Sequence, residues 1–426
     1  MKVAFITLGC KVNIYETNAI QEMFVNNGHE IVKDDEYFDA CIINTCSVTN
    51  TASAKSRKMI RYAIKQNPNA IIGVIGCYSE SDSDEINTIS GVDYIIGNEG
   101  KKDIVELISS GVKRNEALIK LKDILQFKEF EDYNATKFNQ TRAFLKIQDG
   151  CTNFCTFCII PYTRGPIRSK DAFKVIDDMN NIVNEGYKEV VLTGIHTGKY
   201  NDIENNISFT NLIEKILEET KVERLRISSI EINEITEPFL QMFSSNRLAE
   251  HLHLPLQAGS DRVLKAMNRK YNKDEFRAQV NLIKKYIPNI ALTADVICGF
   301  PEETEEEFNE TLEFCKEIGF AKIHAFPFSL RKGTKAQDLK QLHPSVIKER
   351  MNKILELDYE LQLAYNEKFI DKEFDMIIED RHQDYLVGHT SNFIAVYIPY
   401  QDNLQGKLVN IKITKIKNNK VYGELL

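Results

Sequence analysis

Short apolar runs alternate with helical stretches from the start of this 426-residue chain to about residue 330. In the first part the apolar runs are residues 3–8, 40–45, 70–76 and 92–96, and the helical stretches are 13–26 and 52–66. Strands that alternate with helices favour a parallel sheet covered on both faces. We therefore predict an α/β protein whose N-terminal domain, residues 1–112, is a doubly wound parallel sheet.

A second α/β series follows a polar connector, residues 113–136, in which we expect a short helix or hairpin. Its six candidate strands are 143–148, 189–193, 224–229, 251–256, 290–297 and 322–328. Six strand–helix units are too few for a closed eight-stranded barrel. We therefore expect a partial (β/α)6 barrel with its site at the carboxyl ends of the strands. This domain covers residues 137–368 and includes a long exit helix.

The pattern changes again after residue 368. Five short strand-like runs follow, at residues 374–378, 385–389, 393–398, 408–416 and 421–425. Short strands separated by turn residues indicate a small antiparallel β-barrel of the oligonucleotide-binding kind, residues 369–426.

The overall composition is that of an ordinary globular protein. Lys and Arg number 54 against 62 Asp and Glu, which gives a net charge of −8 and excludes a histone-like basic arm. A local basic face can still bind nucleic acid. We find no signal peptide and no apolar run long enough to span a membrane. We expect a cytoplasmic monomer with no membrane partner, and its nine cysteines favour metal or thiol chemistry over disulfides.

The strongest chemical signal is a group of three cysteines, Cys151, Cys155 and Cys158. Three thiolates at this spacing can hold one metal centre, and they are one ligand short of a closed zinc site. Thiolates also hold [4Fe-4S] clusters, usually as four ligands. Three ligands would leave one iron open to a substrate. We favour the cluster, with a zinc site and a chance grouping as the alternatives.

Three other cysteines, Cys10, Cys46 and Cys77, each follow a predicted strand of the N-terminal sheet. The carboxyl ends of parallel strands share one edge, where ligands bind. We therefore expect these cysteines to converge at that edge as a second site. The remaining cysteines are expected to be small buried residues, and these are Cys41, Cys298 and Cys315.

The spacing of Cys151, Cys155 and Cys158, with the aromatic Phe157 before the last cysteine, resembles that of radical S-adenosylmethionine enzymes. The resemblance implies that the open iron binds S-adenosylmethionine and that one electron cleaves it to methionine and a 5′-deoxyadenosyl radical. An electron donor such as flavodoxin or ferredoxin is then required. The cofactor-binding residues implied in this way are Phe157, Gly194, His196, Glu231, Gln257, Arg164 and Arg168. A structural ion-pair role is the alternative for the two arginines.

The two cysteine sets together are similar to those of the methylthiotransferases, and the resemblance spans the whole chain. It rests on residues 9–13, 44–48, 76–78, 160–169 and 253–261. It implies two [4Fe-4S] clusters, a terminal RNA-binding TRAM domain and six catalytic cysteines. It also implies two S-adenosylmethionine molecules, one as methyl donor and one as radical source, with sulfur delivered at the cluster of Cys10, Cys46 and Cys77.

Residues 10–17 and 193–196 look most like the branch of that family that methylthiolates C2 of threonylcarbamoyladenosine beside the tRNA anticodon. Sister branches act on isopentenyladenosine in tRNA or on an aspartate of a ribosomal protein, and both remain alternatives. A non-catalytic iron–sulfur or zinc protein that binds RNA through its last domain is an alternative of a different class.

Residues 51–75 and 407–420 carry several basic side chains and no acidic one. Phosphate attraction to such patches gives affinity without sequence reading. The RNA-binding candidates are Lys55, Arg57, Lys58, Arg61, Lys407, Lys412, Lys415 and Lys417. The alternative interpretations are a solvated helix face and an edge strand guarded by lysine. Tyrosines of the last domain, including Tyr385, Tyr397 and Tyr422, could stack on bases or pack in the barrel.

Overall fold

The computed structural model describes every residue from Met1 to Leu426, and the chain folds into two compact units. Unit 1 contains residues 1–137, 146–170 and 329–337, and unit 2 contains residues 138–145, 171–328 and 338–426. Unit 1 thus holds the N-terminal sheet together with the loop of Cys151, Cys155 and Cys158. None of the helices combines the length and apolar character that crossing a bilayer requires.

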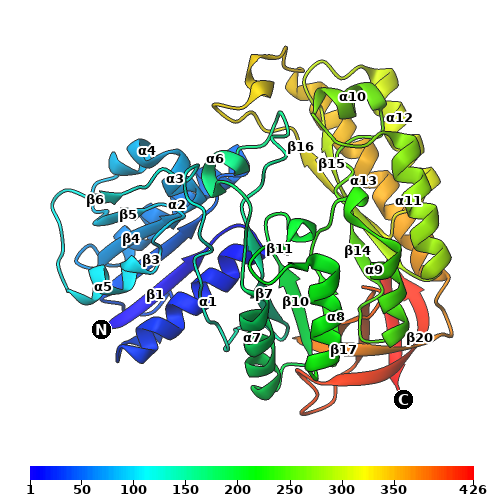
Figure 1. Ribbon diagram of the computed structural model, residues 1–426, viewed down its shortest axis with the longest axis horizontal. Coiled ribbons are helices and arrows are strands. Elements are labelled where there is room, and N and C mark those ends of the chain that lie inside the picture. The colour runs from blue at the N-terminus through cyan, green and yellow to red at the C-terminus, as the bar shows by residue number, and fades with distance from the viewer. The chain divides into compact units, whose positions relative to one another are not determined.

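A six-stranded sheet in the order β2-β1-β3-β4-β5-β6 forms the centre of unit 1 (Figure 1). All adjacent strands pair in parallel. The central strands β3 and β4 are buried along their whole length, which is why their sequences read as continuous apolar runs. The strands are β1 (Lys2–Thr7), β2 (Glu30–Val32), β3 (Ala40–Thr45), β4 (Ile71–Gly76), β5 (Tyr94–Ile96) and β6 (Leu118–Lys120).

Helices cover both faces of this sheet. On one face, α2 (Asn50–Gln66) and α4 (Ser83–Asn87) contribute Ile60 and Ile86 to a core shared with the strands. On the other face, α1 (Lys11–Asn26) packs against β1 and against α5 (Asp103–Ser109), which lies over Gly73 of β4. The prediction of a doubly wound parallel sheet is confirmed.

The connector differs from its prediction. No helix or hairpin forms between residues 113 and 136. Instead, β6 pairs in parallel with β5 and extends the sheet to Lys120. Residues 146–170 add to unit 1 an antiparallel pair, β8 (Gln148–Asp149) and β9 (Arg168–Ser169), and the short helix α6 (Ile160–Arg164).

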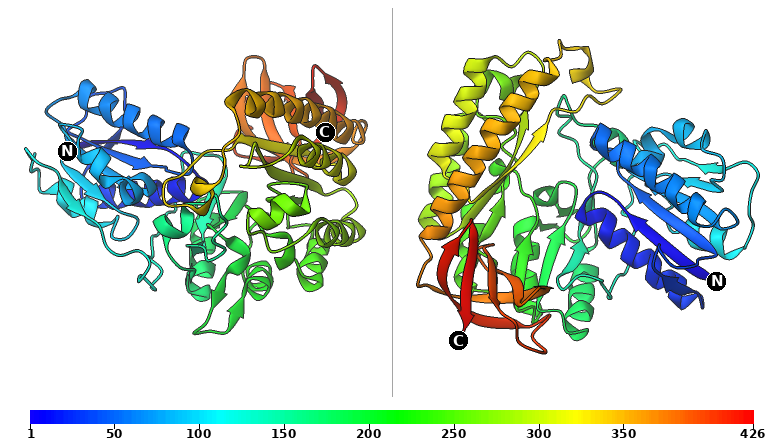
Figure 2. Two further views of the ribbon diagram at one scale, coloured as in Figure 1. Left: turned by 90° about the horizontal axis from the view of Figure 1, so that it is seen from above. Right: turned by 180° about the vertical axis from the view of Figure 1, so that it is seen from behind.

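The main body of unit 2 is the predicted partial barrel. Two three-stranded sheets, ordered β13-β10-β7 and β14-β15-β16, are joined by a bridge between Ser229 and His253. The strands are β7 (Ala143–Lys146), β10 (Glu189–Thr193), β13 (Arg224–Ile227), β14 (His251–His253), β15 (Ala291–Cys298) and β16 (Lys322–Pro327). The surrounding helices are α7 (Ala172–Asn184), α8 (Phe209–Glu219), α9 (Glu237–Gln241), α10 (Asp261–Ala266), α11 (Lys273–Tyr286), α12 (Glu305–Ile318) and α13 (Pro344–Glu367). Figure 2 shows α12 and α13 from behind.

The C-terminal part of unit 2 is a closed barrel in the order β17-β18-β19-β21-β20 (Figure 2). Its strands are β17 (Glu373–His382), β18 (Tyr385–Thr390), β19 (Ala395–Pro399), β20 (Leu408–Lys417) and β21 (Lys420–Leu425). Met376, Val396 and Ile411 are among the residues that fill its interior. The barrel is antiparallel as expected except at one seam, where β19 pairs with β21 in parallel.

Candidate functional site

Three cysteines gather at the carboxyl edge of the sheet in unit 1, and we call them the N-terminal cysteine site. Cys10 immediately precedes α1, Cys46 follows β3, and Cys77 is the first residue of the short helix α3 (Cys77–Ser81). Cys46 and Cys77 are buried, whereas Cys10 is exposed. Burial, together with the nearby Cys77, raises the pKa of Cys46 to about 12.

Glycines allow the strand ends of this site to approach one another closely. Gly9 and Gly76, each directly before a cysteine, have φ values of +100° and +102°, which L side chains rarely adopt. A Cβ at Gly9 would lie 3.1 Å from the Sγ of Cys46. A Cβ at Gly76 would lie 2.6 Å from Oδ1 of Asn44. Only glycine fits at these two positions.

A fully buried arginine, Arg164, lies against the same site. Its Nε donates to the Sγ of Cys77 over 3.3 Å. Its Nη1 donates to Glu16 over 2.7 Å and to Asp149 over 3.2 Å, and its Nη2 donates to Asn13 over 2.5 Å. Although burial alone raises the pKa of Glu16, Arg164 and two lysines hold it well below its usual value. Arg164 therefore joins the N-terminal cysteine site to a buried ion-pair network.

Further buried cations belong to this network. Lys146 binds Glu16 over 2.7 Å and Asp149 over 2.6 Å, and Lys101 also binds Glu16. Arg168 lies 3.6 Å from Asp149. The carboxylates and lysines of this network were not predicted from the sequence. A charged residue at the end of an otherwise apolar run, such as Lys146, was the sequence feature that could have indicated a buried ion pair.

Cys151, Cys155 and Cys158 lie on one loop of unit 1, and we call them the second cysteine site. All three are half-buried. The backbone N–H of Cys151 donates to Gly165 over 3.0 Å, and that of Cys158 donates to Cys155 over 3.0 Å. Gly150, with φ of +75°, precedes the loop, just as glycines precede Cys10 and Cys77.

The side of this loop is covered by two other segments of unit 1. Ala336 donates its backbone N–H to the carbonyl of Thr156 over 2.8 Å. The exposed ring of Phe154 meets Tyr162 of α6 edge-on, with 5.8 Å between the ring centroids. No three or more His, Cys, Asp or Glu side chains anywhere in the chain are grouped closely enough to hold a single metal ion.

The predicted cofactor-binding residues fall into both units. Phe157, Arg164 and Arg168 belong to unit 1, and the two arginines are buried in the ion-pair network. Arg168 additionally donates to the carbonyl of Arg164 over 2.7 Å. Both arginines form buried ion pairs with Asp149.

The other four candidates, Gly194, His196, Glu231 and Gln257, belong to unit 2. Nε2 of His196 lies 2.6 Å from Oε1 of Glu234. Glu231 forms an ion pair with Arg269. Gln257 has φ of +69° and donates its N–H to the carbonyl of Asp295 over 2.8 Å.

The RNA-binding candidates are mostly solvent-accessible. Lys55, Lys58 and Arg61 of α2 are exposed, whereas Arg57 is held by Tyr78 and Glu85. In the C-terminal barrel the lysines of interest are Lys407, Lys415 and Lys417, which are exposed, and Lys412, which is half-buried 3.8 Å from Asp371.

Aromatic rings on the outer surface of the C-terminal barrel form a cluster of Tyr385, Tyr397 and Tyr422. The ring centroid of Tyr422 lies 5.5 Å from that of Tyr385 and 5.7 Å from that of Tyr397. Lys415 lies over Tyr422 at 5.8 Å, and Lys420 lies over Tyr397 at 5.1 Å. We call these five residues the tyrosine–lysine face. Because Tyr385 is 38% exposed and the other two tyrosines are half-buried, the rings lie on the surface rather than in the barrel core.

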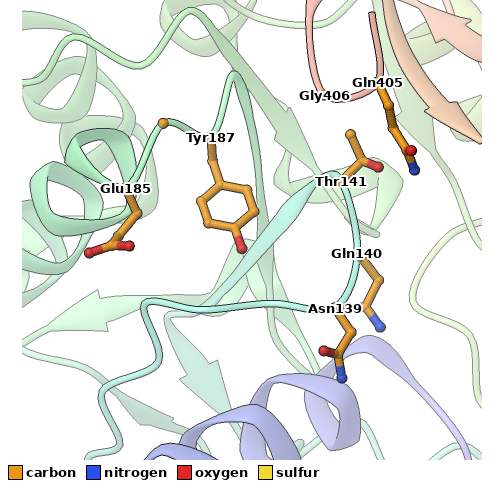
Figure 3. A pocket seen from close by; sticks show the side chains of 8 residues that line it. Asn139, Gln140, Thr141, Glu185, Tyr187, Gln405 and Gly406 are labelled. Atoms are coloured by element: carbon orange, nitrogen blue, oxygen red, sulfur yellow. The ribbon is translucent and has the colours of Figure 1, made fainter. Parts of the chain in front are cut away.

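Unit 2 also has a polar pocket of about 250 Å³. It is lined by Asn139, Gln140, Thr141, Glu185, Gly186, Tyr187, Gln405 and Gly406 (Figure 3). Thr141 and Gln405 both donate to the carbonyl of Glu379 over 3.0 Å, and the hydroxyl of Tyr187 bonds to the backbone of Phe138. The pocket contains no cysteine and none of the predicted site residues.

Three family models match the chain. They are the uncharacterized protein family UPF0004 over residues 2–97, the radical SAM superfamily over residues 145–315, and the TRAM domain over residues 369–426.

Similar proteins cover almost the whole chain. The threonylcarbamoyladenosine tRNA methylthiotransferase MtaB of Bacillus subtilis is 41% identical over 424 residues, covering 97% of this chain and 94% of that protein. The protein of the same name from Aquifex aeolicus is 36% identical, covering 97% of this chain and 100% of that protein. The tRNA-2-methylthio-N(6)-dimethylallyladenosine synthase of Clostridium tetani is 34% identical, covering 98% of this chain and 95% of that protein.

A solved structure shares the fold. It is the radical S-adenosylmethionine methyltransferase TsrM from Kitasatospora setae, determined with cobalamin and a [4Fe-4S] cluster bound. The match has a TM-score of 0.59 at 13% identity and covers 79% of this chain and 76% of that chain.

Proposed function

Because the chain belongs to the family of radical S-adenosylmethionine tRNA methylthiotransferases, we propose that it methylthiolates C2 of N6-threonylcarbamoyladenosine beside the anticodon of tRNA. The observation that carries this proposal is the presence of two separate three-cysteine sites in unit 1. The substrate is supported by 41% identity to a relative named for threonylcarbamoyladenosine, compared with 34% for one named for dimethylallyladenosine.

The donor atoms fit two [4Fe-4S] clusters. Each site offers three thiols, and in a cluster each thiolate binds a different iron, so the ligands need not be grouped around one ion. Two hydroxyls beside the N-terminal cysteine site support this fit. Ser47 follows Cys46, Ser79 lies two residues after Cys77, and both hydroxyls are buried without a hydrogen-bond partner. Cluster sulfides would give these hydroxyls the acceptors that buried polar groups require.

Cys151, Cys155 and Cys158 would hold one cluster, and Cys10, Cys46 and Cys77 would hold the other. When bound, the cluster of the second cysteine site would supply the electron that cleaves one S-adenosylmethionine to a radical. The cluster of the N-terminal cysteine site would supply the place where sulfur is joined to the methyl group of a second S-adenosylmethionine. The chain's own residues would bind and orient the cofactors and would exclude water from the site. Gly9, Gly76 and Gly150 allow the backbone of the cysteine loops to approach its neighbours closely.

Residues at the carboxyl ends of the barrel strands would bind S-adenosylmethionine. The 2.6 Å contact between Nε2 of His196 and Oε1 of Glu234 fixes the imidazole beyond the end of β10, and the ion pair of Glu231 with Arg269 fixes that carboxylate. Both side chains are therefore oriented before a ligand binds, which lowers the entropy lost on binding. Gln257, at its positive φ, is held by the backbone of β15.

The tyrosine–lysine face of the C-terminal barrel would bind the tRNA. Aromatic rings stack on unpaired bases without reading their sequence, and lysines attract phosphates. The exposed Lys55, Lys58 and Arg61 of α2 would supply further phosphate contacts in unit 1. An external one-electron donor of the flavodoxin or ferredoxin kind would supply the electrons.

Analysis of tRNA nucleosides tests the substrate. The anaerobically reconstituted full-length protein is incubated with S-adenosylmethionine, a reductant, and tRNA carrying either threonylcarbamoyladenosine or isopentenyladenosine. We expect the methylthio product only from the first tRNA. Product only from the second would assign the chain to the sister reaction and overturn the proposed substrate.

Iron and sulfide analysis tests the two sites separately. We expect about eight irons per chain in the intact protein and about four in the variant Cys151→Ala/Cys155→Ala/Cys158→Ala, because each cluster contains four. The variant Cys10→Ala/Cys46→Ala/Cys77→Ala should also retain about four irons and should still cleave S-adenosylmethionine, without forming product. About four irons in the intact protein, falling to none in the first variant, would leave no cluster for sulfur transfer and would overturn the proposal.

A further inference from the structure

We propose that Arg164 is a positioning residue of the N-terminal cysteine site, where its guanidinium donates to the sulfur of Cys77 and raises the reduction potential of the cluster bound there. The inference rests on the proposed function, because it requires a cluster at this site. Arg164 follows the second cysteine site in sequence, but its side chain contacts Cys77 of the N-terminal cysteine site.

The orientation of Arg164 is fixed on all sides. Its Nε donates to the Sγ of Cys77 over 3.3 Å, while the two terminal nitrogens are held by Glu16, Asn13 and Asp149. The guanidinium is planar and carries five N–H donors in a rigid fork. With the terminal nitrogens anchored in this way, Nε–H remains aimed at the sulfur.

The helix that carries Arg164 is also attached to the segment near Cys77. Asn98 donates its Nδ2 to the carbonyl of Thr163 in α6 over 2.6 Å. Oδ1 of the same asparagine lies 4.0 Å from the Sγ of Cys77. The backbone of α6 and the side chain of Arg164 are therefore both positioned relative to the sulfur of Cys77.

The charge of the ion-pair network favours a negative sulfur. Its two buried carboxylates are Glu16 and Asp149, and its four buried cations are Arg164, Lys101, Lys146 and Arg168. Two positive charges are therefore unmatched within the network. Buried charge is costly unless it is paired, and the sulfur of Cys77 is the additional acceptor that Arg164 contacts.

This contact has a consequence for electron transfer. The reduction potential of an iron–sulfur cluster depends on its net charge and on the hydrogen bonds to its sulfurs. Reduction adds a negative charge, so a neighbouring cation and an N–H donor stabilise the reduced form more than the oxidised form. Removal of Arg164 should therefore make the potential more negative.

The test is an EPR-monitored redox titration of the N-terminal cluster alone. The full-length variant Cys151→Ala/Cys155→Ala/Cys158→Ala serves as background, because it should retain only that cluster. Into it we would introduce Arg164→Met, Arg164→Lys and, as a matched control, Lys146→Met. Lys146 belongs to the same network and binds the same two carboxylates. Its removal also takes away one buried positive charge.

We expect a more negative midpoint potential with Arg164→Met and a smaller shift with Lys146→Met. Arg164→Lys keeps the charge without the fork, and its potential should lie between those of the background and Arg164→Met. Should Arg164→Met fail to fold, the shift of Arg164→Lys relative to the background carries the test. Equal potentials in the background and the Arg164 variants, or equal shifts for Arg164→Met and Lys146→Met, would overturn the inference alone. A background protein that binds no iron would overturn the proposed function as well.

Discussion

Arg226 donates its Nε to Oε1 of Glu189 over 2.6 Å, with both side chains buried inside unit 2. The same carboxylate accepts Nη1 of Arg224 over 3.0 Å. Arg224 also donates to the carbonyl of Asp375, and Arg226 donates to the carbonyl of Thr390, both in the C-terminal barrel. Glu189 therefore holds the two guanidiniums that attach the C-terminal barrel to β13.

The variant Glu189→Gln should be strongly destabilised. It removes the carboxylate partner of the buried Arg226, which typically costs about 3–5 kcal/mol, and leaves Arg224 with Asp375 as its remaining carboxylate partner. We would measure the free energy of unfolding by chemical denaturation at neutral pH. Glu223→Gln is the matched control, because Glu223 pairs with Lys188 at the surface, where loss of the pair should cost less than about 1 kcal/mol. Equal losses for the two variants would contradict this assignment.

The same carboxyl should contribute to acid denaturation. Burial alone raises the pKa of Glu189, but Arg226 and Arg224 together lower it from 4.5 to about 2. Because the pKa is lower in the folded state, the stabilisation is complete above the unfolded value and is lost as pH falls towards the folded value. The intact protein should therefore lose stability between about pH 4.5 and 2, and Glu189→Gln should lack this part of the loss. Unfolding curves measured across that range would show the difference.

Gly76→Ala should lower the iron content of the N-terminal cysteine site. Gly76 has φ of +102° and ψ of −163°, a region open almost only to glycine, where other residues pay about 1–3 kcal/mol. The added Cβ would also lie 2.6 Å from Oδ1 of Asn44, whose amide is bonded to Asn13 and Thr17. Relief of this contact would displace Cys77. We expect reconstituted Gly76→Ala to bind about four irons in place of about eight.

Gly111→Ala is the control for backbone strain. Gly111 has φ of +71°, but nothing lies within 4 Å of its would-be Cβ. The substitution should cost about 1–2 kcal/mol of stability and leave the iron content unchanged. Equal iron loss in both variants would mean that strain alone, rather than displacement of the cysteine, empties the site.

Much of the fold could be predicted because its central strands are buried on both faces. The run 40–45 coincides with β3, and the run 189–193 coincides with β10. Two strands of the N-terminal sheet that were not predicted, β2 and β6, are short and half-buried or exposed. Both strands lie at edges of the sheet, where the backbone is hydrogen-bonded but the side chains form no apolar pattern. Hydrophobic periodicity therefore could not find them.

The grouping of the three N-terminal cysteines was predictable for a different reason. Parallel strands end at one edge, so Cys10, Cys46 and Cys77 could be grouped from strand positions alone. The contact between Arg164 and Cys77 could not be found in this way, because it joins residues 87 positions apart across an irregular loop. Local patterns carry no information about which buried charge meets which sulfur.

Cys46→Ala and Cys41→Ala should separate a cluster ligand from a structural cysteine on the same segment. Cys46 lies at the carboxyl edge of the sheet, whereas Cys41 lies near the start of β3, fully buried in the apolar core. We expect Cys46→Ala to abolish methylthio transfer while cleavage of S-adenosylmethionine continues. Cys41→Ala should retain both activities and lose about 1 kcal/mol of stability through a small cavity. Iron analysis and product quantification on both proteins would decide, and loss of a cluster in Cys41→Ala would contradict the placement of the site.

Substitutions on the tyrosine–lysine face should weaken tRNA binding in two distinguishable ways. Tyr422→Leu removes a ring but keeps an apolar surface, and loss of base stacking should cost about 1–3 kcal/mol at any salt concentration. Lys415→Gln removes one phosphate contact, so the slope of log affinity against log salt should decrease by about one unit. Lys316→Gln on α12, an exposed lysine 3.3 Å from Glu313, serves as the control and should change neither quantity. Binding of tRNA to the full-length variants, measured at several salt concentrations, would reveal these effects. An unchanged affinity in both barrel variants would show that the tRNA binds elsewhere on the protein.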